Sequence, residues 1–143
     1  MSVRIRETGR IDILLSTMPA DLRSKHLRRA LGDASRKLAR VVRALAPVDD
    51  EDEEEIHIKD HVRTRTFERG QYEIVGRTSV KGLPAGYALA LEYGHQMFLW
   101  GQMTDQQVAP TPFFRPAIDQ TETDREMGII AHLRRTIREL VRV

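Results

Sequence analysis

Two long stretches with the spacing of an amphipathic helix constrain the fold of this chain more than any other feature. Over residues 20–46, apolar side chains recur at steps of three and four, and arginine and lysine fill many positions between them. The same period returns over 114–142. Pro47 stops the first stretch, whereas Pro116 lies in the first turn of the second, where proline is tolerated. We therefore predict two long helices, over 20–46 and 114–142, that each bury one face.

The period changes to two between these helices. Over 56–67, β-branched residues alternate with polar ones, and a turn around Gly70 leads into a second run of the same kind, which predicts a hairpin. We predict that 56–93 forms a small antiparallel sheet of about three to five strands. Its last part, 87–93, fits either a further strand or a short helix. The segment 95–111 holds several large apolar residues and is predicted as a loop.

The order helix, small sheet, helix predicts an α+β fold in which the two long helices cover one face of the sheet. A length of 143 residues fits a single domain over 1–143. The absence of cysteine excludes a disulfide scaffold, a cysteine-based metal site and a thiol nucleophile. No apolar run approaches the ~18 residues of a membrane helix, and the start of the chain lacks the apolar stretch of a signal peptide. We expect a soluble intracellular protein without membrane contacts.

The charges are distributed unevenly along the chain. Seven acidic residues follow Pro47 almost directly in one unbroken run, and the remainder of the chain carries 23 basic against 14 acidic residues, a net charge of +9. Like charges repel one another, so we predict an exposed loop over 49–55. The loop is either solubilising, or faces a basic partner, or lines a passage along which DNA slides. The acidic loop consists of Asp49, Asp50, Glu51, Asp52, Glu53, Glu54 and Glu55.

Constellations that would support catalysis or metal binding are weak. Glu92, His95 and Asp105 form a conceivable acid–base group, but no nucleophile elbow and no phosphate-binding loop accompanies them. His57 and His61 lie four residues apart on a predicted strand, too far apart to share a metal without further ligands. We predict no enzyme, no cofactor and no metal. We interpret Glu92 as a buried carboxylate, either in an ion pair between subunits or hydrogen-bonded to backbone.

The arginine-rich helix faces raise nucleic-acid binding as an alternative function. However, acidic residues interrupt the basic stripe of the C-terminal helix, and aromatic residues, 6% of the chain, do not interleave with the arginines. Stacking on bases is therefore not indicated. We interpret these faces as solvated or as facing a partner.

Three segments, in this order, form a known pattern. They are VVRALAP at 41–47, YALALEYGH at 87–95 and APTPFFRPA at 109–117. Together they are similar to the tail-completion proteins (also called tail-to-head joining or neck proteins) of long-tailed bacteriophages and prophages. The resemblance covers residues from about 21 to the end of the chain. The family pattern often places Thr-Gly after the helix-ending proline, where this chain has its acidic run.

The resemblance implies a small structural virion protein without enzymatic activity. It implies that copies of the chain form a ring, commonly six-fold, at the head-proximal end of the tail and join tail to head. The implied partners are other copies, the tail terminator or tail tube protein, and the head-closure connector. It also implies that DNA passes through the channel without specific binding. A tail terminator or head-closure subunit is the alternative function, and a basic nucleic-acid-binding module is a further one.

The resemblance places the protein in the virion, at the tail or neck, after assembly in the host cytoplasm. In a six-fold ring the acidic loop would repeat around the axis and gather about 42 negative charges, which would repel DNA if the loop faced the channel.

We expect the assembly contacts in the second and third segments and in the loop between them. Prolines lower the ordering cost of a contact, phenylalanines supply apolar anchors, and Arg115 offers several donors to a carboxylate such as Glu92, within or across subunits. Alternatively, Phe113, Phe114 and Glu92 pack the second helix onto the sheet. The predicted assembly residues are Glu92, Tyr93, Gly94, His95, Phe98, Trp100, Pro112, Phe113, Phe114, Arg115 and Pro116.

Overall fold

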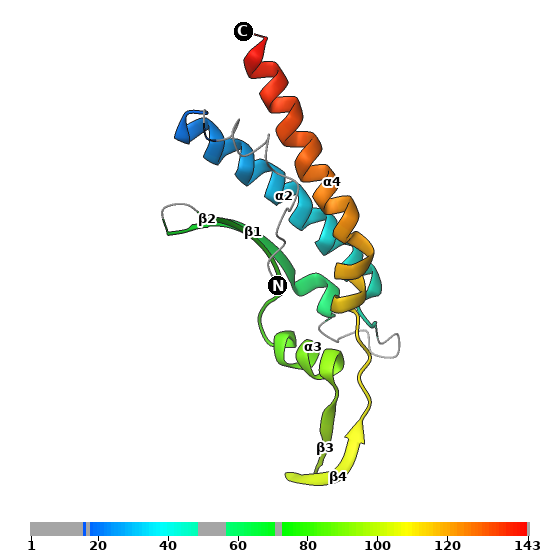
Figure 1. Cartoon of the computed structure of the whole chain (residues 1–143). Helices are drawn as coiled ribbons and strands as arrows, with labels where there is room; N and C mark the ends of the chain where they lie inside the picture. The colour runs from blue at the N-terminus through cyan, green and yellow to red at the C-terminus, as the bar shows by residue number, and fades with distance from the viewer. Residues whose placement is uncertain (1–15, 17, 49–56, 71–72, 143) are drawn as a thin grey trace. The chain divides into compact units, whose positions relative to one another are not determined.

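The computed structural model describes residue 16 and residues 18–48, 57–70 and 73–142 (Figure 1). The predicted acidic loop, 49–55, lies outside these residues. The described elements are α2 (Ala20–Leu45), η1 (Ile58–His61), β1 (Val62–Arg69), β2 (Glu73–Val80), α3 (Pro84–Tyr93), β3 (His95–Leu99), β4 (Gln102–Val108) and α4 (Phe114–Val141).

The two long helices and the α+β class are confirmed. Helices α2 and α4 match the predicted stretches except for one residue at the C-terminal end of each. The four strands form two two-stranded antiparallel sheets, β1–β2 and β3–β4. Among the helices of the described residues, none combines the length and the apolarity that a membrane span requires.

The first strand begins later than predicted, because a short 3₁₀ helix, η1, precedes it. The backbone N–H of Asp60 donates to the carbonyl of His57 at 3.1 Å, and the Arg63 guanidinium donates to the carbonyl of Asp60 at 2.7 Å. These local hydrogen bonds favour a turn over an extended chain. The prediction of strand is therefore wrong for residues 58–61, and His57 and His61 do not share the face of a strand.

The second part of the predicted sheet is a helix, α3, so the helical alternative for 87–93 holds. Pro84 lies in its first turn, and Gly94, with φ of 76°, ends it. The segment between them is rich in alanine and leucine, which favour a helix. It is apolar on all sides except for Glu92, so neither a period of two nor one of 3.6 stands out in the sequence.

The predicted loop over 95–111 is wrong, because most of it forms the β3–β4 hairpin. Trp100 and Gly101 occupy the two central positions of its turn with φ of 53° and 80°. Positive φ at both positions is the mark of the tight turn that suits a hairpin. The usual residues there are asparagine, aspartate and glycine, so Trp-Gly is a poor turn signal in the sequence.

The described chain divides into two compact units, each made of separate stretches. The first comprises the chain as far as Lys37, Thr64–Arg77 and the chain from Thr121. The second comprises Leu38–Arg63 and Thr78–Gln120. Each unit has its own buried apolar cluster, and both long helices contribute to both units.

The first unit packs the early part of α2 against the later part of α4. Ala30, Ile129 and Leu133 are buried there, with further apolar residues around them. Gly76 on β2 lies close to α2: a Cβ at this position would meet the Ser35 hydroxyl at 2.5 Å and the Leu31 carbonyl at 3.2 Å. The absence of a side chain therefore permits the close approach of strand and helix.

Candidate assembly site

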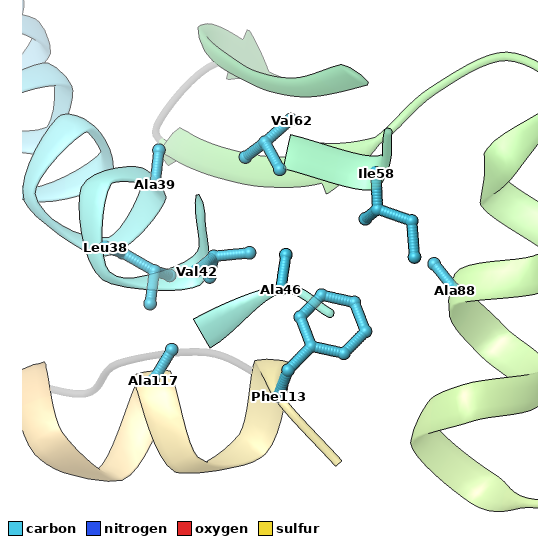
Figure 2. Close-up of a cluster of buried hydrophobic side chains, with 9 residues drawn as sticks. All are labelled: Leu38, Ala39, Val42, Ala46, Ile58, Val62, Ala88, Phe113 and Ala117. Carbon is cyan, nitrogen blue, oxygen red and sulfur yellow. The ribbon is translucent and has the colours of Figure 1, made fainter. Parts of the chain in front are cut away.

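The three segments that carry the family resemblance contribute to one buried cluster in the second unit (Figure 2). Val42 and Ala46 come from the first segment, Ala88 from the second, and Phe113 and Ala117 from the third. Phe113 is 2% exposed and belongs to the largest side chains that are fully buried. These residues lie far apart in the sequence, and their packing joins the end of α2, α3 and the start of α4.

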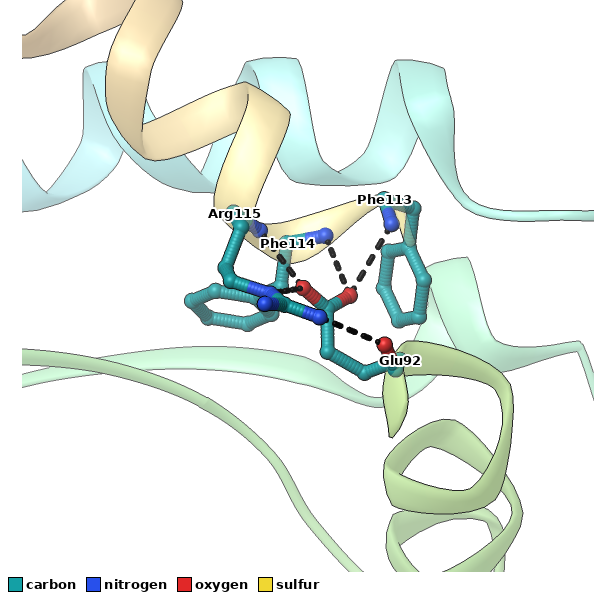
Figure 3. A network of polar contacts seen from close by, with 4 residues as sticks. All are labelled: Glu92, Phe113, Phe114 and Arg115. Atoms are coloured by element: carbon teal, nitrogen blue, oxygen red, sulfur yellow. Dashed lines mark hydrogen bonds and ion pairs between the residues drawn. The ribbon is translucent and has the colours of Figure 1, made fainter. Parts of the chain in front are cut away.

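The carboxylate of Glu92 binds the first turn of α4 (Figure 3). Its Oε2 accepts the backbone N–H groups of Phe113 and Phe114, both at 2.9 Å. Its Oε1 accepts the backbone N–H of Arg115 at 2.9 Å and the Nε–H of the same residue at 3.0 Å. Glu92 is 6% exposed, so its carboxylate is largely withdrawn from water, whereas the Arg115 side chain that it meets is half-exposed.

These contacts satisfy the N–H groups that a helix leaves unpaired at its start. The first four N–H groups of a helix have no partner within it. Here three of them, from Phe113 to Arg115, donate to Glu92, and the next residue, Pro116, has no N–H. Ala117 then donates to the carbonyl of Phe113 at 3.3 Å. Glu92 therefore caps α4 from a helix that lies earlier in the chain.

Arg115 strengthens the same junction from its side chain. It also donates to the backbone carbonyl of Glu92 at 2.9 Å, and its guanidinium lies 5.0 Å from the centre of the Tyr93 ring. The backbone N–H of Thr111 donates to the carbonyl of Leu91 at 2.7 Å. The chain leading into α4 is thus attached to the C-terminal end of α3 at several points.

Gly94 lies at the same junction, and its lack of a side chain is required. Its φ is 76°, which an L side chain rarely adopts. A Cβ here would lie 2.7 Å from the carbonyl oxygen of Val108 and 3.2 Å from Pro110. The glycine therefore lets the two ends of the hairpin approach each other directly after α3.

The electrostatics of Glu92 suit a structural role. Burial opposes its charge, but the backbone N–H groups of Phe114, Arg115 and Phe113 and the Arg115 side chain outweigh burial and lower the pKa of the carboxyl. Both oxygens are occupied, and the anion benefits from the helix dipole of α4. A carboxylate held in this state is a poor proton acceptor, so the arrangement fixes two helices together and does not prepare a general base.

The structure does not bring the conceivable acid–base group together. Glu92 forms its hydrogen bonds with residues at the start of α4, while His95 and Asp105 are exposed on the hairpin. Within the described ranges, no group of three or more histidine, cysteine, aspartate or glutamate side chains is placed to hold a metal ion.

The remaining predicted assembly residues divide into buried and exposed ones. Phe113 packs the interior and Phe114 is half-buried against it, so the alternative interpretation, packing of the second helix, holds for both. Pro112 is exposed, and Pro116 is half-buried in the first turn of α4. Tyr93, Phe98 and Trp100 are exposed by 64%, 64% and 100%.

Met103, which lies opposite Phe98 in the hairpin, belongs to the large apolar residues that the sequence shows in the segment 95–111. Sequence reasoning missed three further exposed apolar residues: Leu83 directly before α3, and Tyr87 and Leu89 on it. The sequence signal for these residues is that the segment would form a helix without a polar face. This signal can be recognised only when the segment is known to be a helix.

Phe67 on β1, the aromatic residue that lies among arginines, lends no support to the alternative of nucleic-acid binding. The ring of Phe67 on β1 already meets two guanidinium groups of its own chain, those of Arg65 at 5.6 Å and Arg77 at 5.3 Å. A hollow at the base of the hairpin, lined by Tyr93, His95, Val108 and Pro110 among others, is open to solvent and does not enclose a ligand.

The chain was compared with protein-family models, with curated proteins and with solved structures, and none of them matches it.

Proposed function

We propose that this chain is a structural subunit of a long-tailed bacteriophage particle. Copies of it form a ring at the head-proximal end of the tail, and the ring joins the tail to the head. Its partners are other copies, the tail terminator or tail tube protein, and the head-closure connector. DNA crosses the ring without specific binding.

The observation that carries this proposal is the junction of the three resembling segments. Their most characteristic residues have physical tasks that depend on one another: Glu92 caps α4, Arg115 returns two bonds to Glu92, and Phe113 fills the cluster that Val42 and Ala46 complete. A chance similarity of three short motifs gives no reason for such a meeting. The junction therefore supports the view that the motifs belong to one fold, and the role follows from the family that they resemble.

The chemistry of the junction agrees with a role in assembly. Its only buried carboxylate in the described residues, Glu92, is saturated with hydrogen bonds and held ionised. The large apolar side chains that remain exposed on α3 and on the β3–β4 hairpin are what a subunit presents before it meets its partners.

Deletion of the gene in the phage or prophage that encodes the chain tests this proposal. We expect full heads and tails of normal length that stay separate in electron micrographs, and we expect the purified chain to restore joined particles when added to the lysate. Tails of abnormal length would favour the alternative of a tail terminator. Unchanged numbers of joined, infectious particles would overturn the proposal. Expression of the gene in trans is the control for effects on neighbouring genes.

A further inference from the structure

Exposed apolar side chains of the second unit gather in two places. The first, the hairpin tip, consists of Phe98, Leu99, Trp100 and Met103, whose exposed fractions lie between 48% and 100%. The second, the α3 face, consists of Leu83, Tyr87, Leu89 and Tyr93, whose exposed fractions lie between 59% and 87%.

The α3 face contains no charged residue of its own, although the Arg115 guanidinium lies 5.0 Å from the Tyr93 ring at its edge. At about 100° per residue, its four side chains span an arc of roughly 160° on the helix, and Gly86 and Ala90 fall within this arc. The opposite side of α3 carries the buried residues Pro84, Ala88 and Glu92. A helix that is apolar on both sides is normally buried on both sides. Within the described part of the chain, only one of the two sides of α3 is covered.

The hairpin tip holds a strained and wholly exposed tryptophan. Trp100 has a φ of 53° and is 100% exposed, a conformation that bulky side chains rarely adopt. Next to it, Phe98 and Met103 lie opposite each other on neighbouring strands and therefore share one face. Strain at a fully exposed position gains nothing for the isolated chain, and such positions concentrate where a molecule binds a partner.

We propose that the hairpin tip of one copy of this chain packs on the α3 face of a second copy. The hairpin tip cannot pack on the α3 face of its own chain, because β3 leads away from the end of α3 (Figure 1). Its five residues span about 17 Å. Each copy offers one tip and one face, so the contact is head-to-tail and closes into a ring or continues as a filament.

The areas of the two surfaces match each other. If a large residue has about 200 Å² of surface, the exposed fractions correspond to roughly 550 Å² on the tip and on the face alike. Complete coverage of both would bury at most about 1,100 Å² in total, which is close to the ~1,000 Å² expected of a specific interface. That the contact closes into a ring rests on the proposed function. The contact between hairpin tip and α3 face can be tested separately.

Disulfide cross-linking tests the contact directly, because the chain contains no cysteine. Met103→Cys places a thiol at the tip, and Gly86→Cys places one within the α3 face, where a Cβ meets no atom within 4 Å. Both variants keep Trp100 and Tyr87. We expect an oxidised equimolar mixture of the two full-length variants to give several-fold more dimer on a non-reducing gel than either variant alone. Gly128→Cys on α4, equally open around its Cβ, replaces Gly86→Cys in the control mixture.

Two results would overturn the inference. Dimers of Met103→Cys alone that exceed those in the mixture would indicate contact between tips. A mixture that gives no more dimer than its Gly128→Cys control would mean that the tip meets a different protein or none. The assay is independent of particle assembly: if cross-links form while gene deletion leaves particles joined, the proposed function fails and this contact stands. If deletion separates heads from tails while cross-links are absent, only this contact fails.

Discussion

Glu92 and Arg115 form a closed pair of contacts between α3 and α4: Glu92 Oε1 accepts the Arg115 Nε–H at 3.0 Å, and the backbone carbonyl of Glu92 accepts a hydrogen bond from the same guanidinium at 2.9 Å. The side chain of Arg115 is half-exposed, whereas Glu92 is buried. The carboxylate, with its three backbone donors, is therefore the more important partner for stability.

We predict that Glu92→Gln lowers the free energy of unfolding by about 2–3 kcal/mol, because hydrogen bonds to a buried charged group are worth more than neutral ones. For a chain of this size the loss corresponds to roughly 5–10 °C in melting temperature. Arg115→Met is the matched comparison and should cost about 1 kcal/mol or less, since a half-exposed ion pair contributes little. Urea titrations followed by circular dichroism measure both. An equal loss for the two variants would contradict the capping role of Glu92.

We predict that the same carboxylate makes the chain sensitive to acid. The pKa of folded Glu92 lies below its ordinary value of 4.5, because hydrogen bonds to the α4 start outweigh the effect of burial. The unfolded chain therefore binds this proton more readily, and the stability from Glu92 is present above about pH 4.5 and lost as the pH falls through the folded pKa. Unfolding free energies of wild type and Glu92→Gln should converge on acidification. A constant difference between pH 6 and pH 3 would argue against this account.

The junction of α3 and α4 contains both features that could be predicted from the sequence and features that could not. The long helices were predictable because their period extends over many turns and prolines mark their limits. The sequence also allowed Glu92 to be predicted as a carboxylate partner of Arg115. It did not allow the N–H groups of Phe113 and Phe114 to be predicted as hydrogen-bond donors to Glu92, because a cap that reaches across 21 residues depends on the tertiary fold.

The β3–β4 hairpin shows why the rest of the site was missed. Its strands are exposed over most of their length, so no burial enforces an alternation of apolar and polar residues. The register is also irregular between Gln96 and Phe98, where the Thr104 hydroxyl donates to the carbonyl of Met97 at 2.8 Å. A bulge of this kind hides the period of two on which strand prediction depends.

A second effect of pH should come from His26 in the first unit. Burial lowers its pKa from 6.5, and the neighbouring His132, Lys25 and Arg29 lower it further. A histidine with a lowered folded pKa stabilises the fold in its neutral form, so stability is present above pH 6.5 and falls as the pH drops below it. His26→Asn should flatten this fall in unfolding free energy between about pH 7.5 and 5.5.

The exposed histidine of the second unit, His95, provides the control for this experiment. His95→Asn removes a histidine without touching the contact of His26 Nδ1 with the Thr136 hydroxyl at 3.3 Å. If His95→Asn flattened the pH profile as much as His26→Asn does, the burial of His26 would not be the cause.

The close approach of β2 to α2 predicts opposite effects for two glycine substitutions. Gly76→Ala should lower the free energy of unfolding by about 1–3 kcal/mol, because its Cβ would overlap the Ser35 hydroxyl and press on the backbone of Leu31. Gly128→Ala lies inside α4 with open space around its Cβ and should raise the free energy by up to about 1 kcal/mol. Thermal melts of the two variants measure both effects. If Gly76→Ala left the melting temperature unchanged, β2 would be able to move away from α2 at no cost in stability.

Trp100 allows stability and association to be separated in one substitution. Trp100→Asn puts at this position the residue that a tight hairpin turn with positive φ prefers, so we expect it to raise the free energy of unfolding by about 0.5–1 kcal/mol. At the same time it removes the largest side chain of the hairpin tip, so cross-linking between Met103→Cys and Gly86→Cys chains should fall several-fold when both carry it. Gly101→Ala is the counterpart: it retains the tryptophan but strains the turn at φ of 80°, and should lower stability. If Trp100→Asn raises the free energy of unfolding and also reduces cross-linking, the role of Trp100 is contact with a partner and not stability of the isolated chain. If Trp100→Asn left cross-linking unchanged, the tip would bind without its tryptophan, and the strain at φ of 53° would need another explanation.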